Sequence, residues 1–151
     1  MARFTGTFEG KVDDKGRASL PADFRDVLKR QDEVSFYVFP SPNLDCLEAC
    51  DDRFMQRVEE SIEEQADMFS EEEDGLTYIA SEARRVSFDS TGRFVLPAEF
   101  RDYAEIEGRA TFVGMFQRFQ IWHPDNYAER APIKKQRAKG MTLKLKPRGD
   151  R

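Results

Sequence analysis

The sequence predicts a mainly β fold with short helices, built from two copies of one unit in a single chain. The first observation is an internal repeat, because residues 13–26 and 89–102 are identical at nine of fourteen positions at a constant offset of 76. The second is that each repeat is followed by a stretch rich in aromatic and β-branched residues, 34–39 and 110–115, as is typical of strands. The length of 151 residues suits one domain or two small modules and excludes a large multidomain enzyme.

Each copy opens with a predicted β-hairpin. Residues 11–20 indicate two short strands joined by a tight turn that contains Asp13 and Gly16. Glycine can take a positive φ in such a turn, and an aspartate at its start accepts hydrogen bonds from the turn's backbone N–H groups. Asp89 and Gly92 occupy the same places in the second copy.

A short helix and two further strands complete each predicted copy. Pro21 and Pro97 hold φ near its helical value and lack an N–H, so each suits the first position of a helix. Phe24, Val27 and Leu28 then recur at i, i+3 and i+4 and give the helix one apolar face. A second apolar segment follows in both copies, so the order strand, strand, helix, strand, strand is expected twice.

The two copies are expected to pair, because one unit of this size buries its hairpin and helix poorly on its own. The simplest arrangement is an intramolecular pseudo-dimer in which both copies share one β core. Phe54, Val58 and Ile62 recur at four-residue spacing and predict a connecting helix with a thin apolar stripe. The predicted organisation is a first repeat over residues 1–54, an acidic helical connector over 55–76, a second repeat over 77–127 and a basic C-terminal tail over 128–151.

The net charge of −5 hides a strong asymmetry along the chain. Residues 51–75 carry two basic and eleven acidic side chains, whereas residues 128–151 carry nine basic and two acidic ones. The acidic run is typical of a solvated face or linker. For the basic tail two interpretations stay open: contacts with nucleic-acid phosphates, or a solvated end that aids solubility.

Several classes of protein are disfavoured by what the sequence lacks. The first residues do not form a signal peptide and no apolar run is long enough to cross a bilayer, so a cytosolic protein without a membrane partner is expected. Cys46 and Cys50 are interpreted as reduced, buried residues, and with His123 as the only histidine no zinc site, metal or cofactor is expected. No evident nucleophile accompanies His123 for which it could act as a general base, so an enzyme is the weakest candidate. Trp122 and His123 are interpreted as a packed strand end.

The spacing Asp-x-x-x-Arg occurs at both predicted turns, as Asp13 to Arg17 and Asp89 to Arg93. One interpretation is structural, with the aspartate capping the turn and pairing with the arginine. The other is that an arginine held by an aspartate at a hairpin tip reaches a DNA major groove, where its fork matches guanine O6 and N7. The residues alone leave both interpretations open.

The doubled pattern Asp-x-x-Gly-Arg-x-x-x-Pro-x-x-Phe-Arg resembles the MraZ family of transcriptional regulators, encoded with bacterial division and cell-wall genes, over residues 1 to about 127. The resemblance implies an AbrB-like swapped-hairpin β barrel and assembly into a ring-shaped homo-oligomer. It further implies a nucleoid-associated repressor that binds short direct repeats in double-stranded promoter DNA of the division and cell-wall cluster, its own operon included.

The resemblance also implies roles for individual residues. Lys15, Arg17 and Arg93 would face DNA, and Asp13 and Asp89 would orient the arginines. Thr91 stands where the first copy has Lys15, so the two copies need not contact DNA equally.

Other functions remain as alternatives. An AbrB-like antitoxin or transition-state regulator is disfavoured because such proteins are usually single-copy chains that dimerise. A homo-oligomeric scaffold would assemble without reading DNA. RNA binding is disfavoured because most aromatic residues fall on presumed core positions rather than on an exposed strand surface.

Overall fold

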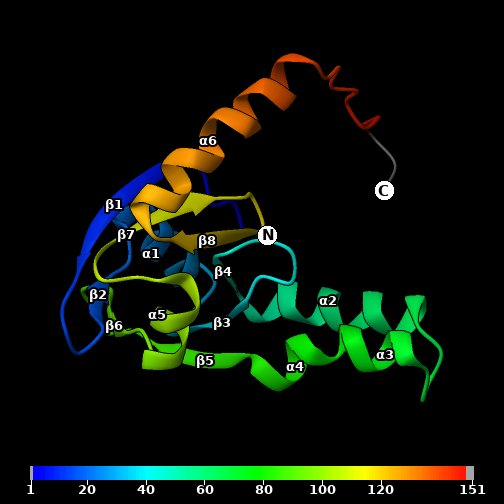
Figure 1. Cartoon of the computed structure of the whole chain (residues 1–151), viewed down its shortest axis with the longest axis horizontal. Coiled ribbons are helices and arrows are strands. Elements are labelled where there is room, and N and C mark those ends of the chain that lie inside the picture. The colour runs from blue at the N-terminus through cyan, green and yellow to red at the C-terminus, as the bar shows by residue number, and fades with distance from the viewer. Residues whose placement is uncertain (1, 149–151) are drawn as a thin grey trace.

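A six-stranded antiparallel sheet with helices on both faces dominates the computed structural model, which describes residues 2–148 (Figure 1). In chain order the elements are β1 (Thr7–Val12), β2 (Arg17–Ser19), α1 (Ala22–Lys29), β3 (Ser35–Pro40), β4 (Leu47–Cys50), α2 (Asp52–Gln65), α3 (Glu71–Leu76), α4 (Tyr78–Glu82), β5 (Arg84–Ser87), β6 (Arg93–Val95), α5 (Ala98–Ala104), β7 (Gly108–Gly114), β8 (Arg118–Trp122) and α6 (Pro124–Lys139). The order strand, strand, helix, strand, strand occurs twice, and the mainly β fold with short helices is confirmed.

Strands of the two copies pair with each other. The large sheet has the order β1-β7-β8-β4-β3-β5, so the first strand of each copy lies against the third strand of the other, β1 on β7 and β5 on β3. The fourth strands, β4 and β8, pair at the centre. The short strands β2 and β6 pair as a separate two-stranded sheet, so both copies contribute to one core.

The closed barrel implied by the family resemblance is not present. β1 and β5 are the two edges of the large sheet, and within residues 2–148 no strand pairing joins them. The reason lies in β2 and β6, which are three residues long and pair along their whole length with each other. Each of them pairs on one side only, and within residues 2–148 no strand pairs with its other side, so the ladder does not continue to the edges of the large sheet.

Phenylalanine rings fill the core between the large sheet and a layer made of α1, α5 and the β2–β6 pair. Phe119 lies near the middle, with its ring centroid 4.9 Å from that of Phe4, 5.0 Å from that of Phe24 and 5.6 Å from that of Phe36. All four side chains are almost fully buried. Tilted and edge-on ring packing at these separations stabilises the core beyond the area buried.

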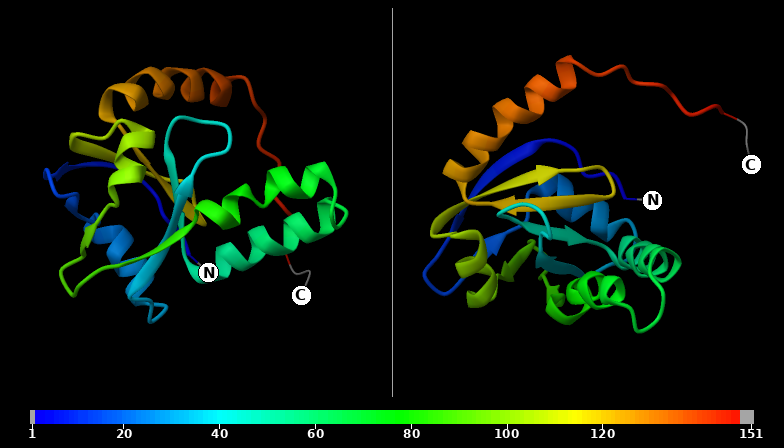
Figure 2. Two further views of the ribbon diagram at one scale, coloured as in Figure 1. Left: turned by 60° about the horizontal axis from the view of Figure 1, so that its bottom comes forward. Right: turned by 45° about the vertical axis from the view of Figure 1, so that its right-hand side comes forward.

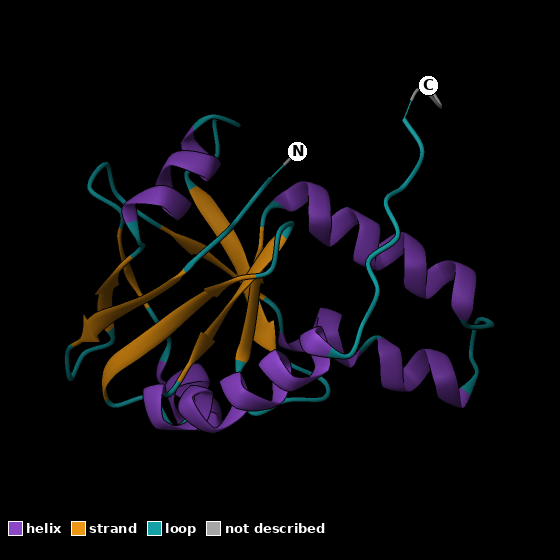
Figure 3. Ribbon diagram, turned by 90° about the horizontal axis from the view of Figure 1, so that it is seen from above, coloured by secondary structure: helices purple, strands orange, loops and turns teal. Residues whose placement is uncertain are grey.

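The acidic connector forms a helical hairpin instead of one helix. Asp51 caps α2, because its carboxylate accepts a hydrogen bond from the Phe54 N–H at 2.8 Å, and the helix runs from Asp52 to Gln65. Ser70 caps the next helix by accepting from the Glu73 N–H at 3.1 Å, so the chain turns between the two caps. α3 and α4 then return beside α2, and the pair projects from the sheet (Figures 1 and 3).

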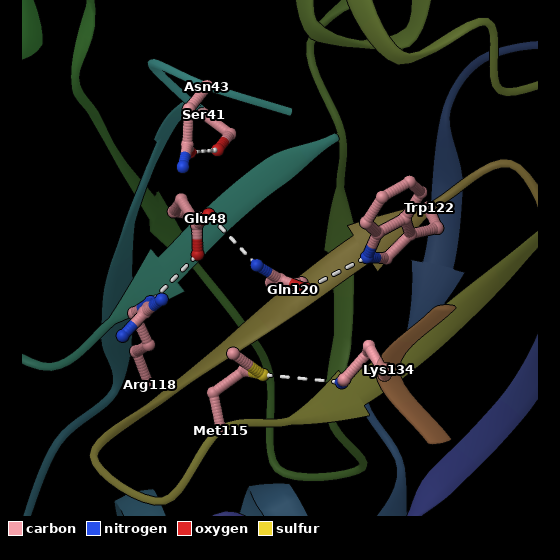
Figure 4. Close-up of polar contacts among 8 residues, drawn as sticks. All are labelled: Ser41, Asn43, Glu48, Met115, Arg118, Gln120, Trp122 and Lys134. Carbon is pink, nitrogen blue, oxygen red and sulfur yellow. Dashed lines mark hydrogen bonds and ion pairs between the residues drawn. The ribbon is translucent and has the colours of Figure 1, made fainter. Parts of the chain in front are cut away.

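The outer face of the large sheet carries a buried polar network at its centre (Figure 4). The Glu48 carboxylate accepts from Arg118 Nε at 2.9 Å and from Gln120 Nε2 at 3.0 Å, and Trp122 Nε1 donates to Gln120 Oε1 at 2.9 Å. Glu48 and Gln120 are nearly inaccessible to solvent. The network therefore ties β4 to β8, the two central strands contributed by different copies.

α6 covers part of this outer face and then leaves it. His123 follows β8 directly and caps α6, because its Nδ1 accepts a hydrogen bond from the Asp125 N–H at 2.9 Å. Tyr127 packs against Trp122, with ring centroids 5.6 Å apart. Beyond them, α6 and residues 140–148 extend away from the rest of the molecule (Figure 2). None of the helices in the described part of the chain combines the length and apolar character needed to cross a membrane.

Candidate nucleic-acid interface

The turn between β1 and β2 is organised around the Asp13 carboxylate. Its Oδ1 accepts from the backbone N–H groups of Lys15 at 3.0 Å and Arg17 at 2.8 Å, and its Oδ2 accepts from Arg17 Nε at 2.5 Å. Gly16 has φ +86, a backbone conformation that favours glycine, and its N–H donates to the Asp13 carbonyl at 3.0 Å. The Arg17 side chain is 53% exposed, so one edge of its guanidinium is held by Asp13 while the rest faces solvent.

The turn between β5 and β6 has the same backbone but a different side-chain arrangement. Asp89 Oδ1 accepts from the N–H groups of Thr91 at 3.0 Å and Arg93 at 2.9 Å, and Gly92 has φ +88. The Thr91 hydroxyl also donates to Asp89 Oδ1, at 2.7 Å. Across residues 2–148 no side-chain hydrogen bond from Arg93 to Asp89 is present, so Arg93 is exposed and less constrained than Arg17.

Each turn is held in place by the other copy. The Leu96 N–H donates to the Gly16 carbonyl at 2.7 Å, and the Leu20 N–H donates to the Gly92 carbonyl at 2.9 Å. Arg101 of α5 donates from Nε to the Leu96 carbonyl at 3.0 Å and approaches the Asp14 carbonyl of the first turn at 3.3 Å.

α1 of the first copy likewise holds the second turn through side-chain hydrogen bonds to its backbone carbonyls. Arg25 donates to the Thr91 carbonyl at 3.4 Å, and Lys29 Nζ donates to the Ser90 carbonyl at 2.7 Å. Both turns are thus rigid because a helix of the opposite copy is attached to them.

The β2–β6 pairing brings the two predicted reading arginines onto one surface. In its register Arg17 lies opposite Val95 and Ser19 lies opposite Arg93, so the two arginines are diagonal neighbours, which in a sheet are about 7–8 Å apart. Ala18 and Phe94, between them, point into the core and are buried, and because strand side chains alternate, Arg17 and Arg93 share the solvent face. The two arginines also line one shallow groove together with Lys11.

The electrostatics of the turns keep both aspartates ionised. The pKa of Asp13 is lowered, first by the hydrogen bond from the Arg17 backbone N–H and then by the Arg17 side chain. The pKa of Asp89 is lowered, first by the Thr91 hydroxyl and then by the Arg93 backbone N–H. β2 and β6 lie at the opposite end of the molecule from the acidic α2–α3 hairpin (Figures 1 and 3), so the densest negative charge is remote from this face.

Arg25 and Arg101 support the turns of the candidate interface, and the sequence prediction did not include them. Both belong to the nine identical positions of the repeat, directly after Phe24 and Phe100, and this identity was the available signal. Their role depends on a partner turn 66 residues away for Arg25 and 87 residues away for Arg101, which no local pattern reveals.

The two cysteines lie away from this face. Cys46 and Cys50 are free and buried, and burial raises the pKa of both thiols, to about 12 for Cys50. Within residues 2–148 no group of three or more histidine, cysteine, aspartate or glutamate side chains is arranged to hold a metal ion.

Comparison with known proteins identifies relatives over most of the chain. The family model described as "MraZ protein, putative antitoxin-like" matches residues 79–137. A protein of Rickettsia bellii (strain OSU 85-389) named "Transcriptional regulator MraZ" is 39% identical over 119 residues, which is 78% of this chain and 79% of the relative. Relatives with the same name from Rickettsia canadensis and Rickettsia rickettsii are 38% and 37% identical over 128 residues, 84% of this chain and 85% of each relative.

Proposed function

The chain belongs to the MraZ family, whose members are transcriptional regulators and not enzymes, and we propose that it binds promoter DNA. The binding element is the two-stranded sheet of β2 and β6, here called the β2–β6 ribbon, on which Arg17 and Arg93 read base edges. The observation that carries the proposal is that both arginines are exposed on one face of a two-stranded ribbon whose turns are fixed. A B-DNA major groove is about 12 Å wide and admits such a ribbon.

The residues of the ribbon and its turns have different roles in binding. Arg17 presents a guanidinium already oriented by Asp13, so less rotational freedom is lost when it binds a guanine edge. Arg93 reaches the same groove with more freedom. Lys15, exposed in the first turn, supplies a phosphate contact that positions the ribbon without reading sequence, while Gly16 and Gly92 maintain the turns.

Self-association would multiply a single weak contact. We infer a swapped-hairpin pseudo-dimer as the unit, supported by the pairing of β1 with β7 and β5 with β3, and a ring of such units as the assembly. A ring repeats the ribbon around an axis, so contacts with short direct repeats add through effective concentration. The target would be the promoter of the division and cell-wall cluster, with the protein acting as a nucleoid-associated repressor of its own operon.

Fluorescence anisotropy with the upstream promoter and a scrambled DNA, at several salt concentrations, tests base reading. Arg17→Ala and Arg93→Ala are each expected to weaken promoter binding about 10- to 100-fold, with the larger loss for Arg17, because a bidentate arginine contact discriminates by about 1–3 kcal/mol. Arg53→Ala is the matched control, since Arg53 is an exposed arginine at the start of α2 on the acidic hairpin. Equal binding of promoter and scrambled DNA by the unsubstituted protein would refute base reading and leave nonspecific binding by the basic tail, or a scaffold.

A further inference from the structure

The tip of the acidic hairpin exposes large apolar side chains in a fixed conformation. Met68 is 73% exposed and Phe69 is 92% exposed. Phe69 has φ +68, an unusual conformation for a residue with a side chain, and its N–H donates to Glu73 Oε1 at 2.8 Å. Ser70 Oγ donates to the Asp67 carbonyl at 2.6 Å and fixes the turn from the other side. The strained backbone is therefore held by local hydrogen bonds, with an aromatic ring left in solvent.

A dense acidic rim surrounds this apolar tip. Asp67, Glu71, Glu72 and Asp74 are exposed, and the sequence contains no lysine or arginine between residues 58 and 83. A partner that covers the tip must therefore combine apolar side chains with positive charge.

The C-terminal segment of the chain has this combination. From residue 141 to 146 it reads Met-Thr-Leu-Lys-Leu-Lys, and in extended backbone alternate side chains point to opposite sides. One side then carries Met141, Leu143 and Leu145, which are 74%, 84% and 83% exposed, and the other carries Lys144 and Lys146. We call residues 141–146 the C-terminal strip.

The placement of the strip favours a second copy as its partner. α6, which carries it, has 16 residues, a length of about 24 Å, and none of them is buried. It leads the strip away from the body of its own chain (Figure 2). If the strip bound DNA phosphates through its lysines, its three large apolar side chains would remain in water. An apolar protein surface with an acidic rim can contact both the apolar and the basic side of the strip.

We propose that the C-terminal strip of one copy docks on the hairpin tip of another copy, with the leucines against Met68 and Phe69 and the lysines against the acidic rim. The contact joins subunits through parts of the chain remote from the β2–β6 ribbon. It rests on the self-association inferred above and names the surfaces that form it.

Charge reversal in pairs tests the contact. The strip-reversed chain carries Lys144→Glu and Lys146→Glu, together with Arg148→Glu two residues after the strip. The tip-reversed chain carries Glu71→Lys, Glu72→Lys and Asp74→Lys. Sedimentation velocity at low salt is expected to show self-association weakened about tenfold or more in each, because attractive pairs become repulsive. An equimolar mixture of the two chains is expected to regain association, because each strip then meets an oppositely charged tip on the other chain. Recovery also shows that both variants are folded.

Two matched variants locate the contact. Phe69→Ala, which keeps every charge, is expected to weaken association as well. A chain with Glu59→Lys, Glu60→Lys and Glu63→Lys has the same net charge as the tip-reversed chain but leaves the tip intact, and it is expected to associate almost normally. If this control weakens association as strongly as the tip-reversed chain, the effect is general electrostatics and the docking proposal is wrong.

The remaining outcomes separate this contact from other possibilities. One outcome is that association stays weak in the mixture but returns in a single chain that carries both reversals. The strip then binds the tip of its own chain, and the proposal that it docks on a second copy is wrong. If only the strip-reversed chain is affected and its promoter affinity falls with it, the strip serves DNA and the proposal is overturned. A monomeric unsubstituted protein refutes the assembly under Proposed function, whereas an oligomer indifferent to both reversals refutes only the docking.

Discussion

Alanine substitutions at the two turn glycines should have clearly different costs, although the turns share one sequence pattern. Both residues have positive φ, +86 at Gly16 and +88 at Gly92, so alanine loses about 1 kcal/mol at either position from backbone conformation alone. A Cβ added at Gly16 would lie 2.4 Å from the Leu96 carbonyl oxygen and 2.9 Å from Arg101 Nε. At Gly92 the nearest atom is Arg25 Cδ at 3.2 Å, which belongs to a flexible side chain.

The backbone contact at Gly16 sets the size of the difference. The turn must move away from Leu96, and this displaces the hydrogen bond from the Leu96 N–H to the Gly16 carbonyl and the one from Arg101 Nε to the Leu96 carbonyl. Each such bond contributes about 1 kcal/mol. We therefore expect Gly16→Ala to lower the free energy of unfolding by about 3 kcal/mol and Gly92→Ala by about 1 kcal/mol.

Urea unfolding followed by tryptophan fluorescence measures both effects. The chain has one tryptophan, Trp122, which is 3% exposed in the folded state on the outer face of the large sheet, so its emission changes when the chain unfolds and this residue enters water. Equal losses for the two variants, or a larger loss for Gly92→Ala, would show that the attachment of the first turn to Leu96 does not constrain it as described.

Three further predictions concern the buried network, the turn carboxylate and the thiols. Glu48→Ala should lower the free energy of unfolding by about 2–4 kcal/mol, because it leaves Arg118 and Gln120 without the carboxylate that accepts their hydrogen bonds. Glu9→Ala, at an exposed ion pair, should cost less than about 1 kcal/mol in the same urea experiment. Hydrogen bonds hold the pKa of Asp13 below its ordinary value, so its contribution to stability is complete above the unfolded-state pKa and is lost as pH falls through the lower folded-state pKa. The stability difference between the protein and Asp13→Asn should therefore vanish in acid, and a difference that persists there contradicts this role. Because burial raises the pKa of Cys46 and Cys50, both thiols should react slowly with a chromogenic disulfide reagent in the folded protein and rapidly in urea, and rapid native reaction would indicate an accessible thiol.

Much of the fold was predictable from local patterns, but the partners of its strands were not. The repeat and the aromatic strand segments predicted the element order, because both signals lie within short stretches of chain. Periodicity is the same whether a strand pairs with its own copy or with the other, so the pairing of β1 with β7 was open. The connector looked like one helix because its composition favours helix throughout, and its division depends on caps at Asp51 and Ser70.

In the candidate interface, too, local hydrogen bonds were predictable from the sequence and tertiary contacts were not. The turn chemistry of Asp13 and Gly16 was predictable because all its hydrogen bonds lie within five residues. In the second turn the Thr91 hydroxyl and the N–H groups of Thr91 and Arg93 all donate to Asp89 Oδ1, and within residues 2–148 no hydrogen bond joins the Arg93 side chain to Oδ2, the oxygen whose counterpart in Asp13 binds Arg17. The attachment of each turn to the opposite helix, through Arg25 and Arg101, is a tertiary contact with no local signature.

The reciprocal attachment of the turns limits how the duplicated halves can diverge. The shape of the first turn depends on Leu96 and Arg101 of the second copy, and that of the second turn depends on Leu20 and Arg25 of the first. A substitution at one of these residues in one copy therefore alters the contacts that hold the turn of the other copy. Although the sequence is duplicated, neither copy can form its turn without the other.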